Sequence, residues 1–176
     1  FVNSIKNELL KFKFEVSLNT FRTVVSIKKF NGAQNRLNLI RDYRSNSSIY
    51  RDFAHSPSKV LATINAVKEL YPNRNLIACL ELHTFSSLNP LFLPQYKHVF
   101  NNANEVWLYV DILKSKNTLH ISKEFLIDLI SHQNIKVFTN VASLQSVFKK
   151  FQPDNNNLLL MSSGNFSGLD LNISFP

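Results

Sequence analysis

LIACLEL, residues 76–82, is the stretch that most directly indicates the fold class. Its seven residues carry one charge, on Glu81, and they follow a break at Tyr71-Pro72-Asn73. A run this apolar is typical of a parallel strand that is covered on both faces. Further strand-like and helix-like stretches alternate after it: EVWLYVDI (105–112), EFLIDLIS (124–131), IKVFTNV (135–141), VASLQSVFKKF (141–151) and NLLLMSS (157–163).

Upstream of this strand, RLNLIRDYRSNSSIYRDFA (36–54) predicts a β-hairpin around the polar turn 45–48. A helix should follow, with Ser56 as its N-cap and Pro57 at its first position. We also expect a helix over residues 91–103 and a loop at the Asn-rich residues 154–157. The order of elements predicts an α/β fold, a Rossmann-like, doubly wound, mostly parallel sheet with an N-terminal β-hairpin and helices on both faces.

Composition narrows the class of protein. The chain has 176 residues, which suits one domain, and its 44% hydrophobic residues exclude a disordered chain. No uncharged apolar run approaches the length that spans a bilayer, so no membrane partner is expected. The net charge of +8 favours anionic partners, but the basic residues are scattered and form no nucleic-acid stripe.

The chain ends and the cysteine count bear on location. No export signal opens the sequence, and it begins with Phe1 rather than Met, which suggests a fragment of a longer protein. Cys79, the only cysteine, can form no internal disulfide and is expected to be a buried core residue. A cytoplasmic location fits these features.

Ligands of open α/β sheets gather outside the carboxyl ends of the strands, so four junctions are candidate sites. At the first, Asp52 ends a strand and His55 lies beside a helix N-terminus, which favours a phosphate or a ribose. The alternative is that these two side chains only brace the turn. The other three junctions are residues 81–89, residues from 111 onward, and residues 162–168.

The second junction offers hydrogen-bonding groups that ordinary loops also contain, namely His83, Thr84, Ser86 and Ser87. The last junction holds Gly164 and Gly168, two of the three glycines, which allow a ligand or another backbone to come close. A tight turn is the alternative there. No GxGxxG and no GxxxxGK[ST] loop is present, and His98, His120 and His132 have no metal-ligand spacing. Trp107 and Tyr109 are expected to be core residues.

Two motifs in tandem resemble the ATP-dependent Mur ligases of bacterial peptidoglycan synthesis. FNGAQNRL (30–37) resembles the F-x-G-x-x-x-R-[LF] linker motif of that family, and RDFAHSP (51–57) resembles its D-[YF]-[AG]-H-x-P motif. LELHTFSS (80–87) is similar to the family's strand that ends in a polar segment, and NANEVWLY (102–109) to its A-D-E-V strand. LLLMSSGNFSGLD (158–170) resembles the branch that attaches a tripeptide to UDP-N-acetylmuramate more than the alanine-adding branch.

The resemblance implies only the last part of a three-domain enzyme. Residues 1–35 would be the tail of the central ATPase domain and the linker, and residues 36–176 the C-terminal domain. The missing N-terminal and central domains of the same chain would bind the UDP-sugar and hold most of the ATP and Mg²⁺. The enzyme would phosphorylate the carboxylate of UDP-N-acetylmuramate with ATP, and an amino acid or peptide amine would attack the acyl phosphate. The fragment alone would be inactive.

The family's functional residues transfer to particular positions. Arg36, Asp52 and His55 match the motif residues expected at ATP, and this agrees with the affinity of a guanidinium for phosphate and of a carboxylate for ribose. A second group would line the amine-substrate pocket by position: His83, Thr84, Ser86, Ser163, Gly164 and Asn165. No metal ligand and no catalytic residue are assigned within the fragment.

Several alternatives stay open. The sequence departs from the family at Ser58, Lys59 and Asn89, and it lacks the D-N-P-[RA] motif, which leaves the incoming amine in doubt. L-Alanine addition is therefore an alternative to tripeptide addition. A free-standing nucleotide-binding module would lack an upstream P-loop domain. A nucleic-acid-binding protein would show strongly salt-dependent binding, and no motif for it is present.

Overall fold

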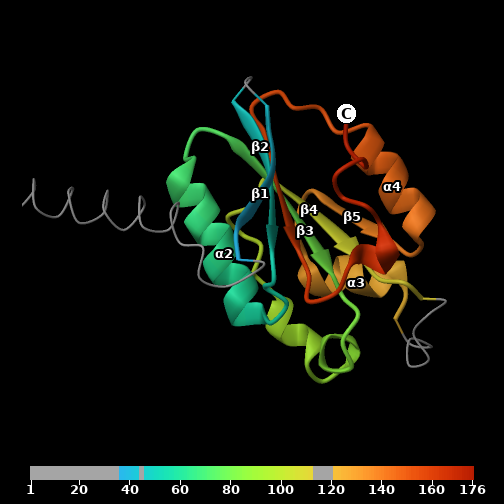
Figure 1. Ribbon diagram of the computed structural model, residues 1–176. Coiled ribbons are helices and arrows are strands. Elements are labelled where there is room, and N and C mark those ends of the chain that lie inside the picture. The colour runs from blue at the N-terminus through green and yellow to red at the C-terminus, as the bar shows by residue number, and fades with distance from the viewer. Residues whose placement is uncertain (1–35, 44–45, 113–120) are drawn as a thin grey trace, which may run out of the picture. The chain divides into compact units, whose positions relative to one another are not determined.

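The computed structural model describes residues 36–43, 46–112 and 121–176 (Figure 1). The predicted lead-in 1–35 lies outside these residues, as does His120. A six-stranded sheet has the order β1-β2-β6-β3-β4-β5. Its strands are β1 (Asn38–Tyr43), β2 (Ser47–Asp52), β3 (Asn75–Glu81), β4 (Glu105–Tyr109), β5 (Ile135–Phe138) and β6 (Asn156–Met161). The helices are α2 (Pro57–Leu70), α3 (Lys123–Ile130) and α4 (Val141–Lys149), with single 3₁₀ turns at Ser86–Leu88, Leu93–Tyr96 and Phe166–Gly168.

The topology confirms the predicted fold class. β1 and β2 form the N-terminal hairpin and pair antiparallel, with a register irregularity between Leu39 and Arg41. All other neighbours in the sheet pair in parallel. β6, the last strand in sequence, lies between β2 and β3, so it is one of the two central strands of the sheet.

Helices cover both faces of the sheet, as the sequence predicts (Figure 1). One face packs on α2 and α3 through Val60, Ile64 and Leu126. The other packs on α4 and the C-terminal segment through Leu144, Phe148, Phe166, Leu171 and Phe175. Because both faces are covered, the central strands β3 and β6 are buried almost throughout, which explains the apolar run at 76–82.

The core expectations are confirmed. Cys79, Trp107 and Tyr109 are buried on the α4 face of the sheet. Trp107 stacks on Phe148 with ring centroids 6.2 Å apart, so this aromatic side chain packs β4 against α4. α2 begins at Pro57, as expected, and Ser56 is its N-cap without a side-chain capping hydrogen bond. Val60, Ile64 and Val67 of this helix are buried, whereas Leu61 is exposed.

Two local predictions are wrong. Residues 91–103 form a short 3₁₀ turn and a series of turns instead of a helix. Pro94 lacks the N–H that a helix interior needs, and His98 adopts a positive φ of 67°, which ends any helical path. The Asn-rich residues do not all form a loop, because β6 begins at Asn156. The buried Asn157 side chain accepts a hydrogen bond from Ser48 N (3.1 Å).

Candidate functional site

The carboxyl ends of four neighbouring strands form one edge of the sheet. Asp52 of β2 pairs with Met161 of β6, and Leu80 of β3 pairs with the same residue. Glu81 in turn pairs with Tyr109 of β4. Beyond the strands, Ser162 N donates to Asp52 O at 3.0 Å. The four junctions singled out in the sequence therefore lie side by side in the structure.

Neighbouring chain segments diverge at this edge. After β2 and after β3 the chain continues over the α2 face, where Val60 and Leu88 are buried. After β6 it continues over the opposite face, where Phe166 is buried. Ligands of open α/β sheets bind where neighbouring chain segments diverge in this way. The turn after β6, residues 162–168, is thus flanked on both sides by such a divergence.

Asp52 holds the first junction together. Its carboxylate is 8% exposed and accepts hydrogen bonds from Leu37 N (Oδ2, 2.8 Å) and Ala54 N (Oδ1, 2.7 Å). These bonds fix the start of the described chain, next to Arg36, against the turn that leads into α2. The bracing role considered from the sequence is therefore present. Thr63 Oγ1 also donates to Oδ1, at 3.4 Å, so Oδ2 is the oxygen that keeps a second lone pair for a ligand hydroxyl.

His55 lies at the entry to α2. Its Nδ1 is 2.9 Å from Phe53 O, and because a carbonyl oxygen only accepts, Nδ1 donates this bond. The ring makes an edge contact with the exposed Phe53, with centroids 5.3 Å apart. Tyr96 OH donates to the backbone carbonyl of His55 at 2.5 Å and anchors the turn to the 3₁₀ segment. Arg36 is exposed.

Glu81 is the buried centre of the edge, although the sequence analysis assigned it no role. Its carboxylate is 5% exposed, and Oε2 accepts hydrogen bonds from Phe166 N (2.9 Å) and Ser162 Oγ. The ring of His83 follows, with Nδ1 3.9 Å from Glu81 Oε2 and Nε2 3.5 Å from Ser163 Oγ. Glu81 therefore ties the ends of β3 and β6 together and places His83 beside Ser163.

Gly164 packs directly on this cluster. A Cβ at this position would lie 2.9 Å from Glu81 Oε2 and 3.0 Å from His83 Nε2, closer than real Cβ contacts. The close approach that the sequence analysis considered is thus made to Glu81 and His83. Gly164 N donates to Ser162 Oγ (2.7 Å), and Arg51 donates to Gly164 O (3.0 Å).

Three other predicted residues make mainly local bonds. Thr84 and Ser87 exchange hydrogen bonds that cap the turn at Ser86–Leu88, with Thr84 N to Ser87 Oγ at 3.0 Å and Ser87 N to Thr84 Oγ1 at 3.1 Å. Ser86 is exposed, and its hydroxyl lies 3.2 Å from Thr84 Oγ1. Asn165 accepts a bond from Gly168 N at 3.1 Å and so caps its own turn. These contacts fix the turns after β3 and β6.

A polar network lies at the carboxyl end of β4. Tyr109 OH donates to Ser167 Oγ at 2.7 Å, and Ser167 Oγ donates to Asp111 Oδ2 at 3.0 Å. Burial raises the pKa of Tyr109 to about 12, so its hydroxyl stays protonated and remains a donor. The position of Asp111 after a predicted strand is the one sequence feature that points to this network. Glu81, by contrast, could have been found as the one charge within a buried strand.

The described residues bear on two further expectations. In residues 36–43, 46–112 and 121–176, no group of three or more His, Cys, Asp or Glu side chains is placed to hold a metal ion. Within the same ranges, no helix is long and apolar enough to cross a membrane.

The fold and the polar groups at the strand ends indicate the class of domain. This is a doubly wound α/β domain with buried and semi-exposed polar groups converging at its topological switch point, the place where such domains bind ligands.

Comparison with known proteins then gives its relatives. UDP-N-acetylmuramate–L-alanine ligase of Brachyspira hyodysenteriae is 28% identical over 142 residues, which are 79% of this chain and 30% of that protein. A murein peptide ligase from Psychrobacter arcticus has the same fold, with a TM-score of 0.64 and 20% identity over 79% of this chain and 29% of that one. In sequence the chain is similar to part of a UDP-N-acetylmuramate–L-alanine ligase, and it shares its fold with part of a murein peptide ligase.

The chain spans about 30% of the length of the curated relative. The same fold also occurs in E. coli FolC, solved in complex with DHPP and ADP, with a TM-score of 0.51 and 15% identity over 74% of this chain and 28% of that one. No family model matches the chain.

Proposed function

We propose that this chain is the C-terminal domain of an ATP-dependent ligase of peptidoglycan synthesis or recycling. The ligase joins the amine of a tripeptide to the carboxylate of UDP-N-acetylmuramate. The carboxylate attacks the γ-phosphorus of ATP and releases ADP, and the amine then attacks the acyl phosphate and releases inorganic phosphate. The curated relative and the peptide ligase neighbour, both ligases by name, support the reaction class.

One observation carries the proposal. The turn RDFAHSP and the segments LELHTFSS and MSSGNFSG, which are far apart in the sequence, converge at one edge of the sheet. Ser162 N bonds to Asp52 O, and Ser162 Oγ bonds to Glu81 Oε2. The three motifs that resemble the family therefore form one continuous surface, as a shared site requires.

On the nucleotide side, Asp52, His55 and Arg36 fit ATP by their chemistry. The second lone pair of Asp52 Oδ2 suits a ribose hydroxyl, and the exposed Arg36 guanidinium suits phosphate oxygens. Their placement depends on the bond from Leu37 N to Asp52, because it holds the residue after Arg36 against the turn. The ADP complex of the FolC neighbour, which has the same fold, supports a nucleotide partner.

On the amine side, the proposal gives His83, Ser163 and Gly164 the central places. They lie within contact distance of one another around Glu81. Thr84, Ser86 and Asn165 complete the rim, and their local bonds keep its shape. We assign Mg²⁺ and most phosphate contacts to the domains beyond this chain, and we place the enzyme in the cytoplasm, where the substrate carboxylate and ATP would meet.

The test is an assay of the full-length protein that contains this chain. Purified enzyme should convert ATP to ADP over many turnovers only when UDP-N-acetylmuramate and L-Ala-γ-D-Glu-meso-diaminopimelate are both present. Asp52→Asn should raise the KM for ATP by about tenfold and leave the KM for the tripeptide unchanged. Asp154→Asn, an exposed matched control, should change neither constant. No ADP release with any amine would refute the proposed reaction.

L-Alanine is the second candidate for the amine. The curated relative, at 28% identity, carries the name of the alanine-adding enzyme, whereas the MSSGNFSG segment resembles the peptide-adding branch. The same assay separates the two, because the preferred amine will have the higher kcat/KM. A preference for L-alanine would keep the ligase proposal and overturn the tripeptide assignment.

A further inference from the structure

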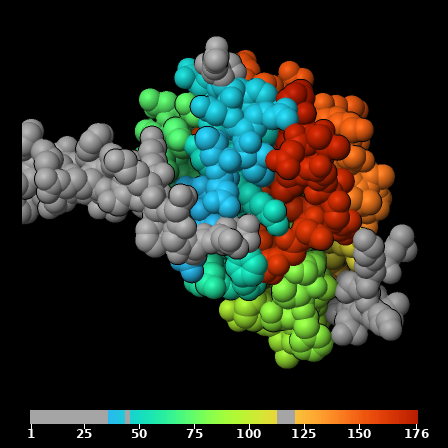
Figure 2. Space-filling model, viewed as in Figure 1, coloured from blue at the N-terminus to red at the C-terminus, as the bar shows by residue number. Residues whose placement is uncertain are grey.

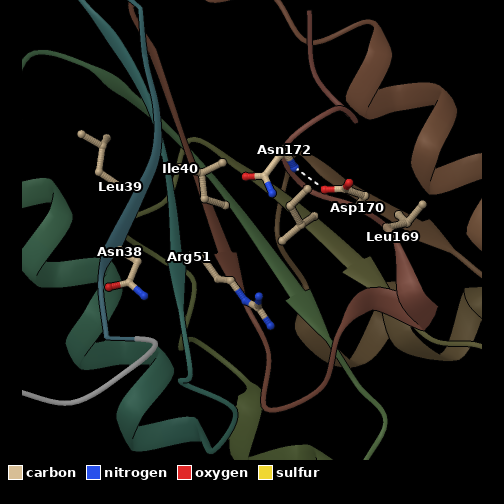
Figure 3. A pocket seen from close by; sticks show the side chains of 8 residues that line it. Asn38, Leu39, Ile40, Arg51, Leu169, Asp170 and Asn172 are labelled. Atoms are coloured by element: carbon tan, nitrogen blue, oxygen red, sulfur yellow. Dashed lines mark hydrogen bonds between the residues drawn. The ribbon is translucent and has the colours of Figure 1, made fainter.

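A polar pocket lies beside the proposed amine site, on the α4 face of the sheet. It occupies about 350 Å³ between the hairpin and the C-terminal segment (Figure 3). Figure 2 shows the hairpin and the C-terminal segment next to each other on the viewed face. The pocket is lined by Asn38, Leu39, Ile40, Arg51, Leu169, Asp170, Leu171 and Asn172.

The pocket carries a cation and an anion on different walls. Arg51 projects from β2, and Asp170 belongs to the C-terminal segment (Figure 3). No ion pair joins the two side chains in the structure of residues 36–43, 46–112 and 121–176. The amides of Asn38 and Asn172 supply donors and acceptors between them. Such a lining is complementary to a small ligand that bears both a carboxylate and an ammonium group.

The walls of this pocket are held in place by bonds to the chain itself. Arg41, on the hairpin, donates to Asn172 O (2.7 Å) and to Phe175 O (3.1 Å). Ser174 Oγ donates to Asp170 O at 2.5 Å, and Asp170 Oδ1 accepts from Asn172 N at 2.9 Å. The C-terminal segment is therefore fixed against β1, so a ligand meets charges that are already positioned.

Arg51 connects the pocket to the proposed amine site. One of its terminal nitrogens donates to Gly164 O at 3.0 Å, and Gly164 packs on His83 and Glu81. The remaining guanidinium N–H groups include donors that suit a carboxylate. A substrate bound with its reacting amine near His83 would thus extend toward Arg51 over the backbone of Gly164.

We propose that this pocket binds the distal, zwitterionic amino-acid end of a peptide amine, with Arg51 on its carboxylate and Asp170 on its ammonium group. The identity of the substrate rests on the proposed function. L-Alanine has a single amine, which must be free to react, whereas a peptide ending in meso-diaminopimelate keeps a second amino-acid centre that does not react. Arg51 and Asp170 are then specificity-determining residues that favour the peptide over L-alanine.

The experiment titrates the 176-residue chain with meso-diaminopimelate and follows backbone amide signals by NMR. Two matched compounds that share its five-carbon segment between the amino-bearing positions complete the set: pimelate lacks the ammonium groups, and cadaverine lacks the carboxylates. We expect saturable binding of meso-diaminopimelate, with shifts at Asn38 and Asp170. Pimelate and cadaverine should each bind at least about tenfold more weakly, because one of the two charges is then left without a partner.

Variants assign the two charges. Arg51→Gln and Asp170→Asn should each weaken binding of meso-diaminopimelate about tenfold. Asn at position 170 can still accept the bond from Asn172 N, so the wall keeps its shape. Lys149→Gln and Asp154→Asn remove the same charges from exposed positions elsewhere and should leave the affinity unchanged. Thermal unfolding of each variant verifies that the fold is intact.

Any of four results would overturn the inference. These are no saturable binding of meso-diaminopimelate, equally tight binding of pimelate, binding that neither variant weakens, and NMR shifts confined to His83 and Ser163. None of these outcomes depends on ligase activity. Failure of the pocket therefore leaves the proposed reaction standing, and absence of ADP release in the full-length assay leaves the binding result standing.

Discussion

Replacing Glu81 tests whether a buried carboxylate organises the site. Glu81→Ala removes the acceptor for Phe166 N and for Ser162 Oγ. A buried donor left without an acceptor costs about 1–3 kcal/mol, and two such donors cost about 2–6 kcal/mol. The truncation also removes one buried methylene group, which is worth about 0.8 kcal/mol. Because Ser162 can turn toward another acceptor, we expect a loss of about 3–5 kcal/mol in the free energy of unfolding.

Glu81→Gln separates the charge from the shape of the side chain. The amide oxygen can accept both bonds, so only their charge-assisted part is lost, and we expect a loss of about 1–2 kcal/mol. Urea denaturation of the 176-residue chain measures both variants, with Glu69→Gln on the exposed face of α2 as the control near zero. A Glu81→Ala variant within about 1 kcal/mol of the parent would refute the reasoning. So would equal losses for Ala and Gln.

Three other predictions concern single side chains. Gly164→Ala should destabilise the chain by about 1–2 kcal/mol and shift the His83 ring signals in NMR, because the new Cβ would lie too close to Glu81 and His83. Gly168→Ala is the control: a Cβ there has no neighbour within 4 Å, so the His83 ring signals should stay in place. Burial raises the pKa of the Cys79 thiol, so a thiol reagent at pH 8 should label the folded chain at least about 100-fold more slowly than the urea-unfolded chain. Burial also raises the pKa of Tyr109 from 10.0 to about 12, so the folded state holds this proton more tightly than the unfolded state. Stability should therefore fall as the pH rises from about 10 to about 12, and Tyr109→Phe should make that fall shallower in urea denaturation; an unchanged slope would contradict the assignment.

The sequence predicted the fold because its strongest signals come from burial. LIACLEL could be assigned to a central parallel strand since both of its faces are covered, and the hairpin followed from the polar turn between two β-forming stretches. The helix over 91–103 was predicted from its apolar content, and Tyr96 and Phe100 are indeed buried. Apolar content shows that a segment packs on the core, but Pro94 and the positive φ of His98 prevent one continuous α-helix there, and only the 3₁₀ turn Leu93–Tyr96 forms.

The site was harder to predict, because its geometry depends on pairs of residues distant in the sequence. Glu81 and Ser162 are 81 positions apart, and only the placement of β6 beside β3 brings them into contact. Asn157 shows the same limit, since a local Asn-rich pattern is typical of a loop, while Ser48 and Arg74 provide partners that make the buried amide favourable. Residue types at strand ends indicated where ligands bind, but not which side chains hold the edge together.

Asp52 shows why bracing and binding need not be alternatives. A carboxylate offers about four acceptor positions, and the bonds from Leu37 N, Ala54 N and Thr63 Oγ1 occupy three of them. These bonds bring Arg36 and His55 to the same turn, so the structural role creates the place at which a nucleotide would bind. The remaining lone pair, on Oδ2, belongs to a side chain that is already immobile, and a rigid acceptor loses little entropy when a hydroxyl binds to it. A residue that only braced the turn could be replaced by any well-packed acceptor, whereas ribose binding requires that this remaining acceptor position stay accessible to a ligand.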